Sequence, residues 1–507
     1  MGTTVAEADH PAELPAEPGD DTGLPEPAEA GRSGGSGGSG GSAGVGLAAA
    51  APLTAEARAE RAARARAAAA RLSAEGVDGV ILSWVDNAGI TRVKSVPVRR
   101  LEHAAAWGVG AAPCFDVFLV DDSITTGHHV GGPVGDLRLI PDVSRLCRLA
   151  AQPGWAWAPA DRYAQDGTPH PGCQRQFTRR MVRSAELRGL GLRAGIEVEW
   201  VVALAGPPEQ PPVHPTHGPA YGLHRLADLS DYLRELLRAL DEQRLTVLQL
   251  HPEYAPGQFE VSVAAEDPVD AADTTVLLRQ TIRAVGLRHG LRTSFAPAVE
   301  PDGVGNGGHL HLSLWRDGQN LGQGGPGRHG LTAEAESFLA GALAELPALL
   351  TLGAPSPASY LRLVPQRWAG AFQCWGLENR EAALRLIAGP PGEGAGTANA
   401  EFKCFDAAAN PYLVIGAVIA AGLAGLDARR VLPPEVPTDP AALPEGEVPR
   451  LPAALAQALA AYRTSGLLRE ALGGPLYEAV LAVRQAEIEL FADHTPEQLA
   501  AATRWRY

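Results

Sequence analysis

The chain of 507 residues is long enough for two or three domains with a large hydrophobic core. Its formal net charge of -15 argues against nucleic acid and anionic membranes as partners, because both require basic patches. Five scattered cysteines without Cys-x-x-Cys spacing indicate reduced cytoplasmic thiols, not a disulfide framework or a zinc site. We find no signal peptide and no run of about 18 apolar residues, the longest candidate being 412–426, so no membrane span is expected.

The N-terminal part begins with a segment that is unlike a folded domain. Residues 1–52 combine an acidic, proline-rich stretch with a glycine–serine linker, which predicts a disordered tail. Residues 53–73 are rich in Ala, Arg and Glu and predict a helix. Residues 79–98 alternate like a β-hairpin and open a small α+β domain that we place at 74–158.

A larger second domain is predicted over residues 159–507. Four prolines between residues 151 and 172 predict an irregular connection between the two domains. Apolar periodicity in the second domain predicts helices over 174–189, 227–242, 266–290 and 332–350.

Carboxylates recur in strand-like segments of this second domain. Glu197 and Glu199 alternate in GIEVEW and therefore point to one face of a strand. A turn at Pro256-Gly257, between two further strands, can bring Glu253 and Glu260 to one edge of a site. Two such anions repel each other unless a hard cation lies between them, and two solvated glutamates are the alternative interpretation.

Basic and imidazole side chains accompany these acids. His309, His311 and Ser313 alternate on one strand directly after the glycine-rich turn GVGNGG. Glu401 and Lys403 share one face of the strand EFKCF. Three arginines lie among mostly apolar neighbours, where guanidinium groups need anionic partners: Arg362, Arg380 and Arg385.

Together these side chains form a candidate site for phosphoryl transfer. The possible metal ligands are Glu197, Glu199, Glu253, Glu260, His309 and Glu401, enough for two or three cations of the Mg²⁺ or Mn²⁺ type. Cations on phosphate oxygens, faced by arginines, are what phosphoryl transfer requires. A nuclease or phosphatase uses similar metals but has less need of the arginines. The sequence has neither a P-loop nor a G-x-G-x-x-G motif, so any nucleotide must be held differently.

The ordered motifs GIEVEW, HPEYAPGQFE, GNGGHLHLSLW, RLVP, NREAALRLI and EFKCFDAAANPYL resemble the glutamine synthetase family, in its bacterial class I branch. The resemblance covers about residues 74–507. It implies an α+β fold with an N-terminal β-grasp domain and a catalytic domain. In that catalytic domain a curved antiparallel sheet forms part of a barrel with flanking helices. It also implies a homo-dodecamer of two hexameric rings, with each active site shared between neighbouring subunits.

The resemblance implies a role for each matched residue. One metal is held by Glu199, Glu253 and Glu260, and a second, near the nucleotide phosphates, by Glu197, His309 and Glu401. ATP is bound by His311, Ser313, Arg380 and Arg385, the two arginines acting on the phosphates. The amino-acid substrate is bound by Arg362, Gly305 and Lys403, and Tyr221 lines the ammonium pocket.

The chain also departs from the family pattern. The flap glutamate that helps to deprotonate ammonium is replaced by Trp368, which cannot act as a base but can pack on an organic amine. The aspartate that completes the ammonium site from a neighbouring subunit corresponds to Asp121 or Asp122. On the acid side, Val304 replaces an asparagine, and Lys403 stands where the family usually has arginine. The loop 427–449 contains no tyrosine, so we expect no control by adenylylation there.

We therefore predict an ATP-dependent γ-glutamyl–amine ligase of the cytoplasm. It joins glutamate to an organic amine through a γ-glutamyl phosphate, with Mg²⁺ or Mn²⁺ as cofactor and ATP as co-substrate. Ethanolamine, a polyamine and other amines remain open, as does an acid other than glutamate. The alternatives are a glutamine synthetase that uses ammonia and a non-catalytic, regulatory relative.

Overall fold

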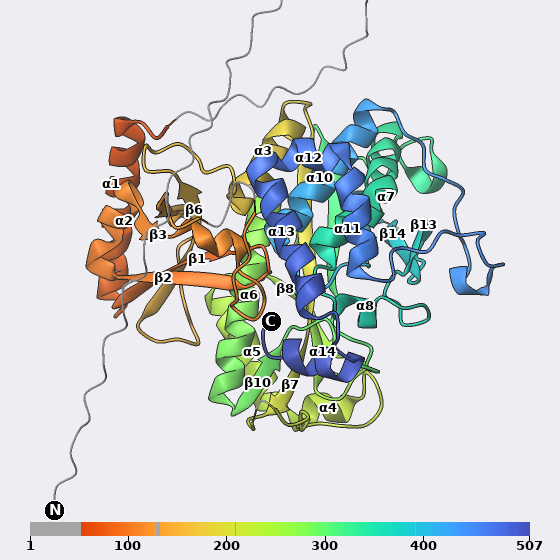
Figure 1. The fold of residues 1–507 in the computed structure, drawn as a ribbon, viewed down its shortest axis with the longest axis horizontal. Coiled ribbons are helices and arrows are strands. Elements are labelled where there is room, and N and C mark those ends of the chain that lie inside the picture. The colour runs from red at the N-terminus through yellow and green to blue at the C-terminus, as the bar shows by residue number, and fades with distance from the viewer. Residues whose placement is uncertain (1–51, 128–131, 208, 391) are drawn as a thin grey trace, which may run out of the picture. The chain divides into compact units, whose positions relative to one another are not determined.

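The computed structural model describes residues 52–127, 132–207, 209–390 and 392–507, and the predicted tail lies outside these ranges apart from residue 52. Within the described ranges the strands form two sheets, one of six and one of nine strands (Figure 1). The smaller sheet belongs to the N-terminal part of the chain, and the larger one carries the candidate site.

The N-terminal sheet is mixed and is covered by two helices. Its order is β2 (Thr91–Pro97), β1 (Gly79–Val85), β6 (Trp155–Tyr163), β4 (Leu137–Pro141) and β3 (Val109–Ala111), and β5 (Cys147–Arg148) pairs with β6. The central pair β1–β6 is parallel, whereas the other pairs are antiparallel. The helices are α1 (Ala55–Ala74) and α2 (Leu101–Trp107). Ala65 and Leu72 of α1 pack with Val80 and Leu82 of β1 in one hydrophobic cluster.

The predicted irregular connection at 151–172 was wrong, because β6 runs through it, and the domain boundary placed at 158/159 falls inside this strand. Pro159 occupies a strand position opposite Ser83 of β1. Proline has no N–H to donate, but its carbonyl still accepts a hydrogen bond from the Asp142 amide at 2.8 Å. The buried alanines 156, 158 and 160 bind this strand into the core, so apolar burial outweighs the proline signal.

The larger sheet is curled into a half-barrel. Its order is β13 (Phe372–Leu377), β14 (Ala382–Ile387), β15 (Asn399–Phe402), β11 (Gly308–Arg316), β7 (Gly191–Leu204), β9 (Gln258–Val263) and β8 (Val247–Pro252). Two short strands extend it, β10 (Leu291–Ser294) on β7 and β12 (Gln319–Asn320) on β11. All pairs are antiparallel except β13–β14. These observations agree with the α+β fold expected from the family resemblance.

Helices surround this sheet, and Figure 1 shows α10 among α3, α7 and α12. Their bounds are α3 (Gln174–Glu186), α4 (Leu223–Asp228), α5 (Ser230–Glu242), α6 (Pro268–Arg288), α7 (Ala333–Gly353), α8 (Ser359–Arg362), α9 (Gly394–Thr397), α10 (Pro411–Asp427), α11 (Leu455–Thr464), α12 (Gly466–Leu472), α13 (Gly474–Leu490) and α14 (Pro496–Thr503). The helices predicted over 174–189, 266–290 and 332–350 are confirmed with small shifts at their ends. The helix predicted over 227–242 is instead divided between α4 and α5.

The sequence did not lead us to expect that helix α7 is long and apolar enough to cross a membrane. Its mean hydropathy of 1.3 and its length would allow it to cross a membrane, although it contains glutamates that interrupt any continuous apolar run. It is mostly buried inside the fold, where it packs against α10 and α11. A single buried helix of this kind is typical of a protein core and is weak evidence for a membrane span.

Candidate active site

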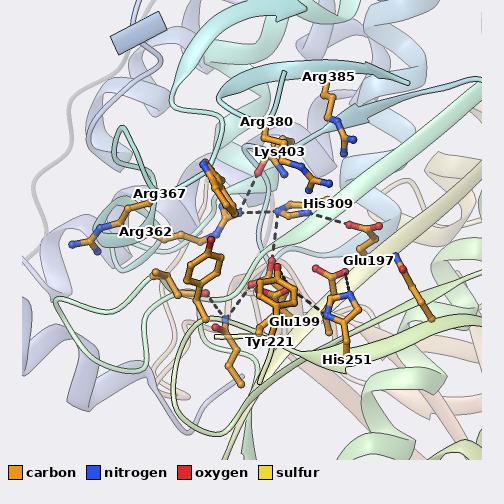
Figure 2. Close-up of a pocket in the computed structure, with 18 of the residues that line it drawn as sticks. Glu197, Glu199, Tyr221, His251, His309, Arg362, Arg367, Arg380, Arg385 and Lys403 are labelled. Carbon is orange, nitrogen blue, oxygen red and sulfur yellow. Dashed lines mark hydrogen bonds and ion pairs between the residues drawn. The ribbon is translucent and has the colours of Figure 1, made fainter. Parts of the chain in front are cut away.

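A cavity of about 540 Å³ collects most of the predicted site residues (Figure 2). Those that line it are Glu197, Glu199, Tyr221, Glu253, Glu260, Gly305, His309, His311, Arg362, Trp368, Arg380, Arg385 and Lys403. Glu401 lies directly behind this lining and contacts His309, Arg385 and Lys403. Figure 2 shows Arg380, Arg385 and Lys403 on one side of the cavity, and Glu199, Tyr221 and His251 on the other.

Besides Glu401, two predicted residues lie outside this cavity. Ser313 accepts a hydrogen bond from the Trp315 indole at 2.9 Å and lines a neighbouring cavity of about 550 Å³, which His311 also borders. Asp121 does not line the cavity of its own chain, and its carboxylate accepts hydrogen bonds from the Ser123 amide and hydroxyl at 2.9 and 2.6 Å.

The register of the sheet places the acids and imidazoles beside one another. Residues directly opposite on antiparallel strands project from the same face. His309 of β11 lies opposite Glu197 of β7, and His311 lies opposite Glu401 of β15. Glu260 of β9 lies opposite Glu199 of β7 on one side and opposite His251 of β8 on the other.

The first group of acids is crowded. Burial, together with repulsion from Glu199, raises the pKa of Glu253 to about 7. Burial also raises the pKa of Glu260. The Tyr221 hydroxyl donates to Glu253 Oε1 at 2.6 Å. A cation between these carboxylates would remove the repulsion, so the group fits a divalent metal.

His251 belongs to the same group and was missed in the sequence. Its Nδ1 lies 3.4 Å from Glu253 Oε1 and its Nε2 lies 3.3 Å from Glu260 Oε1. The hydrogen bond with Glu260 raises the pKa of His251 to about 9. Donor atoms of these three side chains lie within 4.8 Å of one another, close enough to share one ion. Its place two residues before Glu253 was the available signal, because residues two apart on a strand share a face.

The second group is built around Glu197 and Glu401. His309 Nδ1 lies 3.4 Å from Glu197 Oε2 and 3.2 Å from Glu401 Oε1, and His311 Nε2 lies 3.4 Å from Glu197 Oε1. Although burial opposes ionisation, hydrogen bonds with both imidazoles hold the pKa of Glu197 well below its usual value. Donor atoms of Glu197, His311 and Glu401 also lie within 4.8 Å of one another. This oxygen-rich set with imidazole suits Mg²⁺ or Mn²⁺.

Cationic side chains close the other side of the second group. Arg385 and Lys403 donate to the two oxygens of Glu401 at 3.0 and 3.1 Å. Burial opposes ionisation of Glu401, but Lys403 and His309 hold its pKa well below the usual value. The Arg362 guanidinium lies 3.1 Å from His309 Nε2 and donates to the Lys403 carbonyl at 3.2 Å. The site therefore places fixed positive charge beside the carboxylates, as transfer of a phosphoryl group requires.

A buried glutamine, also missed in the sequence, joins the anionic turn to the glycine-rich loop. The side-chain amide of Gln258 donates to Glu199 Oε2 at 3.1 Å and to the Gly305 carbonyl at 2.7 Å. Gly305 has a φ of 77°, and a side chain there would collide with the Pro297 carbonyl oxygen. Only glycine therefore fits this turn, which borders the cavity.

The curled half-barrel, the anionic groups and the facing arginines define an ATP-dependent γ-glutamyl ligase of the glutamine synthetase type. Residues 171–501 match the model of the glutamine synthetase catalytic domain, and residues 66–170 match that of the glutamine synthetase N-terminal domain. The chain belongs to the glutamine synthetase family. Members of this family are ATP-dependent and use divalent metals.

Several relatives cover nearly the whole chain. Gamma-glutamylpolyamine synthetase GlnA3 of Streptomyces coelicolor is 56% identical over 442 residues, or 86% of this chain and 95% of that protein. Gamma-glutamylanilide synthase of Acinetobacter sp is 28% identical over 477 residues, or 86% of this chain and 93% of that protein. A solved structure described as a novel glutamine synthase homolog has a TM-score of 0.76 and 34% identity, covering 85% of this chain and 99% of that one.

The raised pKa of Glu253 predicts a release of protons when metal binds. In the metal-free protein at pH 7 this carboxyl group is about half protonated, but a metal ligand must be ionised. We expect Glu253 to contribute about half a proton at pH 7, and the imidazoles of His251 and His309, whose pKa values are also raised, to contribute further protons. Calorimetry of Mn²⁺ binding in buffers of different ionisation enthalpy measures this release. Glu253→Gln should reduce the release at pH 7, and equal heats in all buffers at pH 7 would contradict it.

Proposed function

We propose that this protein is a γ-glutamyl–amine ligase, which uses ATP to join the side-chain carboxylate of glutamate to an organic amine. The observation that carries the proposal is Trp368 in the wall of the cavity, where ammonia-using members of the family have a glutamate. An indole offers a packing surface for a carbon chain and an attractive face for a cation, but no base. The printed names of two relatives, a γ-glutamylpolyamine synthetase and a γ-glutamylanilide synthase, support this choice.

Two or three Mg²⁺ or Mn²⁺ ions are proposed as cofactors. The residues that would hold them are Glu199, Glu253 and Glu260 for one ion, and Glu197, His309 and Glu401 for another. Bound there, such ions supply charge that neutralises and polarises phosphate oxygens. The close donor atoms and oxygen-rich composition described above fit this use.

The chain's own cations are proposed to orient the two substrates. Arg362 is only 3% exposed and borders the cavity beside Gly305, so it suits the α-carboxylate of glutamate. Lys403 takes the γ-carboxylate, and it exchanges its contact with Glu401 for one with substrate. Arg380 and Arg385 line the same cavity and face the phosphates, where they neutralise charge that develops during transfer.

The nucleotide is proposed to occupy the neighbouring cavity of about 550 Å³. His311 borders both cavities, so the phosphates would enter the first cavity while the base remains in the second. Ser313 lines the second cavity, and its hydroxyl is proposed to contact the nucleotide there.

The amine side is proposed to be completed by a neighbouring subunit. Tyr221 and Trp368 border the cavity in the same chain. In a homo-dodecamer, Asp121 would reach the site of the adjacent subunit and attract the incoming amine. Between the two candidate aspartates, Asp122 is engaged by Arg92 at 2.7 Å and by Arg506 at 3.3 Å. Asp121 has the freer carboxylate for this role, and we propose the cytoplasm as the compartment.

The other two readings have less support. If this protein were a glutamine synthetase that uses ammonia, it would lack the flap carboxylate that helps to deprotonate ammonium. A non-catalytic relative would have no reason to keep six metal-ligand positions and to bring them together around one cavity.

A phosphate-release assay with an amine panel tests the function. The purified protein is supplied with ATP, glutamate, Mg²⁺ or Mn²⁺, and either ammonia, ethanolamine, 1,4-diaminobutane, butylamine or aniline. We expect kcat/KM for at least one organic amine to exceed that for ammonia by about tenfold or more, the scale of one well-placed contact. Ammonia matching every organic amine would overturn the amine preference. Failure to consume ATP with any donor would overturn the ligase function itself.

A further inference from the structure

Two aromatic side chains form a corner in the wall of the cavity. Tyr254 lies in the turn between β8 and β9, directly after Glu253, and Trp368 lies in the loop before β13. Their ring centroids are 5.2 Å apart at an interplanar angle of 82°, so the two rings meet edge to face. We call Tyr254 and Trp368 the aromatic corner. Tyr254 and Trp368 are 39% and 45% exposed and line the cavity, so their side chains are accessible to a ligand bound there.

Tyr221 extends the aromatic surface from the corner toward the first group of acids. The ring of Tyr221 lies 5.6 Å from that of Tyr254 at 88°, a second edge-to-face contact. The Tyr221 hydroxyl is bonded to Glu253, as described above. The aromatic surface therefore runs from the carboxylate side of the cavity outward to Trp368.

The backbone at Trp368 adopts an uncommon conformation. Trp368 and Gln366 have φ angles of 52° and 60°, values that residues other than glycine rarely adopt. The carboxylate of Glu381 accepts hydrogen bonds from both amides, at 2.7 Å from Trp368 N and 3.2 Å from Gln366 N. Glu381 is 7% exposed, and no salt bridge within the described ranges neutralises it. It therefore acts as a positioning residue that fixes Trp368 in the wall.

A surface of this kind suits a cation on a carbon chain. Aromatic faces attract an ammonium group within about 6 Å, and the attraction grows when water is excluded. In an edge-to-face pair the edge of one ring covers one face of the other, so this contact leaves the remaining ring faces available to a ligand. The carboxylate of Glu381 accepts a hydrogen bond from the backbone amide of Trp368 and so adds negative potential at this end of the cavity.

Building on the proposed ligase function, we propose that the aromatic corner binds the second ammonium group of a diamine or polyamine substrate. The first amino group then reaches the activated γ-carboxylate, while the chain between the two nitrogens lies along the tyrosines. Tyr254 is the specificity-determining residue in this assignment. A monoamine of the same length reaches the reacting carboxylate equally well but leaves the corner without its cation.

The test compares two amines that differ in their far end, 1,4-diaminobutane and butylamine, with Tyr254→Leu. Loss of one aromatic wall should raise KM for the diamine about tenfold and that for butylamine by less than about threefold. Tyr254→Phe keeps the ring and should leave both KM values within about twofold. Hydroxylamine traps the activated glutamate without needing the corner, so the ratio of kcat/KM for the diamine to that for hydroxylamine should fall about tenfold in Tyr254→Leu and stay within about twofold in Tyr254→Phe.

Glu381→Gln provides the second variant. The glutamine side chain keeps one oxygen acceptor and replaces the other with an NH₂ group, so one of the two amides loses its partner. We expect KM for the diamine to rise about fivefold while the hydroxylamine kcat stays within about twofold. Trp107→Leu, at an aromatic residue that is 55% exposed and outside the cavity, is the control and should change neither value.

The outcomes separate the two proposals. If Tyr254→Leu changes KM equally for the two amines, or changes neither, the proposed role of the aromatic corner is overturned, while the proposed ligase function still stands. If Tyr254→Leu does not fold, as judged by its melting temperature, Glu381→Gln decides in the same way. No turnover of any organic amine by the wild-type protein would instead overturn the proposed function.

Discussion

Glu401→Gln is expected to lower kcat for phosphate release about 10³-fold, the scale seen when a group that stabilises developing charge is removed. The Glu401 carboxylate is 1% exposed and contacts His309, Arg385 and Lys403 at 3.0 to 3.2 Å. Its neutral replacement removes a metal ligand and leaves three cationic or metal-binding groups to repel one another. Activity and metal affinity should therefore fall together, which calorimetry with Mn²⁺ and a phosphate-release assay can measure.

Lys403→Met, made in the Glu401→Gln background, tests the two effects of losing Glu401. These are the missing metal ligand and the repulsion between the groups that it contacted. Removing Lys403 relieves part of the repulsion, so the double variant should regain thermal stability relative to Glu401→Gln. It should not regain activity, because the metal ligand is still missing and the cation proposed for the γ-carboxylate is now missing too. Recovery of phosphate release in the double variant, or full Mn²⁺ binding by Glu401→Gln alone, would contradict the assignment of Glu401 as a ligand.

Alternation along single strands was enough to predict several members of the site. Glu197 and Glu199 share a face of β7, and His309 and His311 share a face of β11, as the two-residue period requires. The cross-strand register that sets His309 opposite Glu197 could not be read from the sequence, because β7 is 14 residues long and admits many registers. The resemblance to a known family supplied that pairing as an expectation.

Residues that hold the backbone of a loop in place could not be predicted from the sequence. Glu381 follows Arg380 in NREAALRLI and gives no sign that its carboxylate holds the backbone of residues 366 and 368. Nothing in the local sequence predicts positive φ angles at Gln366 and Trp368, since neither residue favours them. The boundary predicted at 158/159 falls inside β6 for a related reason, because burial of β6 in the sheet overrides the local preference of Pro159.

Trp368→Glu is expected to shift the preference for ammonia over an organic diamine by about 10²-fold. A carboxylate at this position attracts ammonium and accepts its proton, and general-base assistance contributes about 10²-fold or more. At the same time the aromatic corner loses its indole, so KM for 1,4-diaminobutane should rise about tenfold. The ratio of kcat/KM for ammonia to that for the diamine, measured by phosphate release, reports the shift.

Trp368→Gln is the matched control, because glutamine has the shape of glutamate without its charge or basicity. Both variants lose the indole, and the glutamine variant should weaken diamine binding at least as much as the glutamate variant, whose charge still attracts an ammonium group. Only the glutamate variant should gain with ammonia, and its advantage over the glutamine variant should shrink as pH rises toward the pKa of ammonium, because free ammonia needs no base to remove its proton. If the two variants use ammonia equally well, the charge at residue 368 does not select the amine. The preference would then have to come from the shape of the cavity alone.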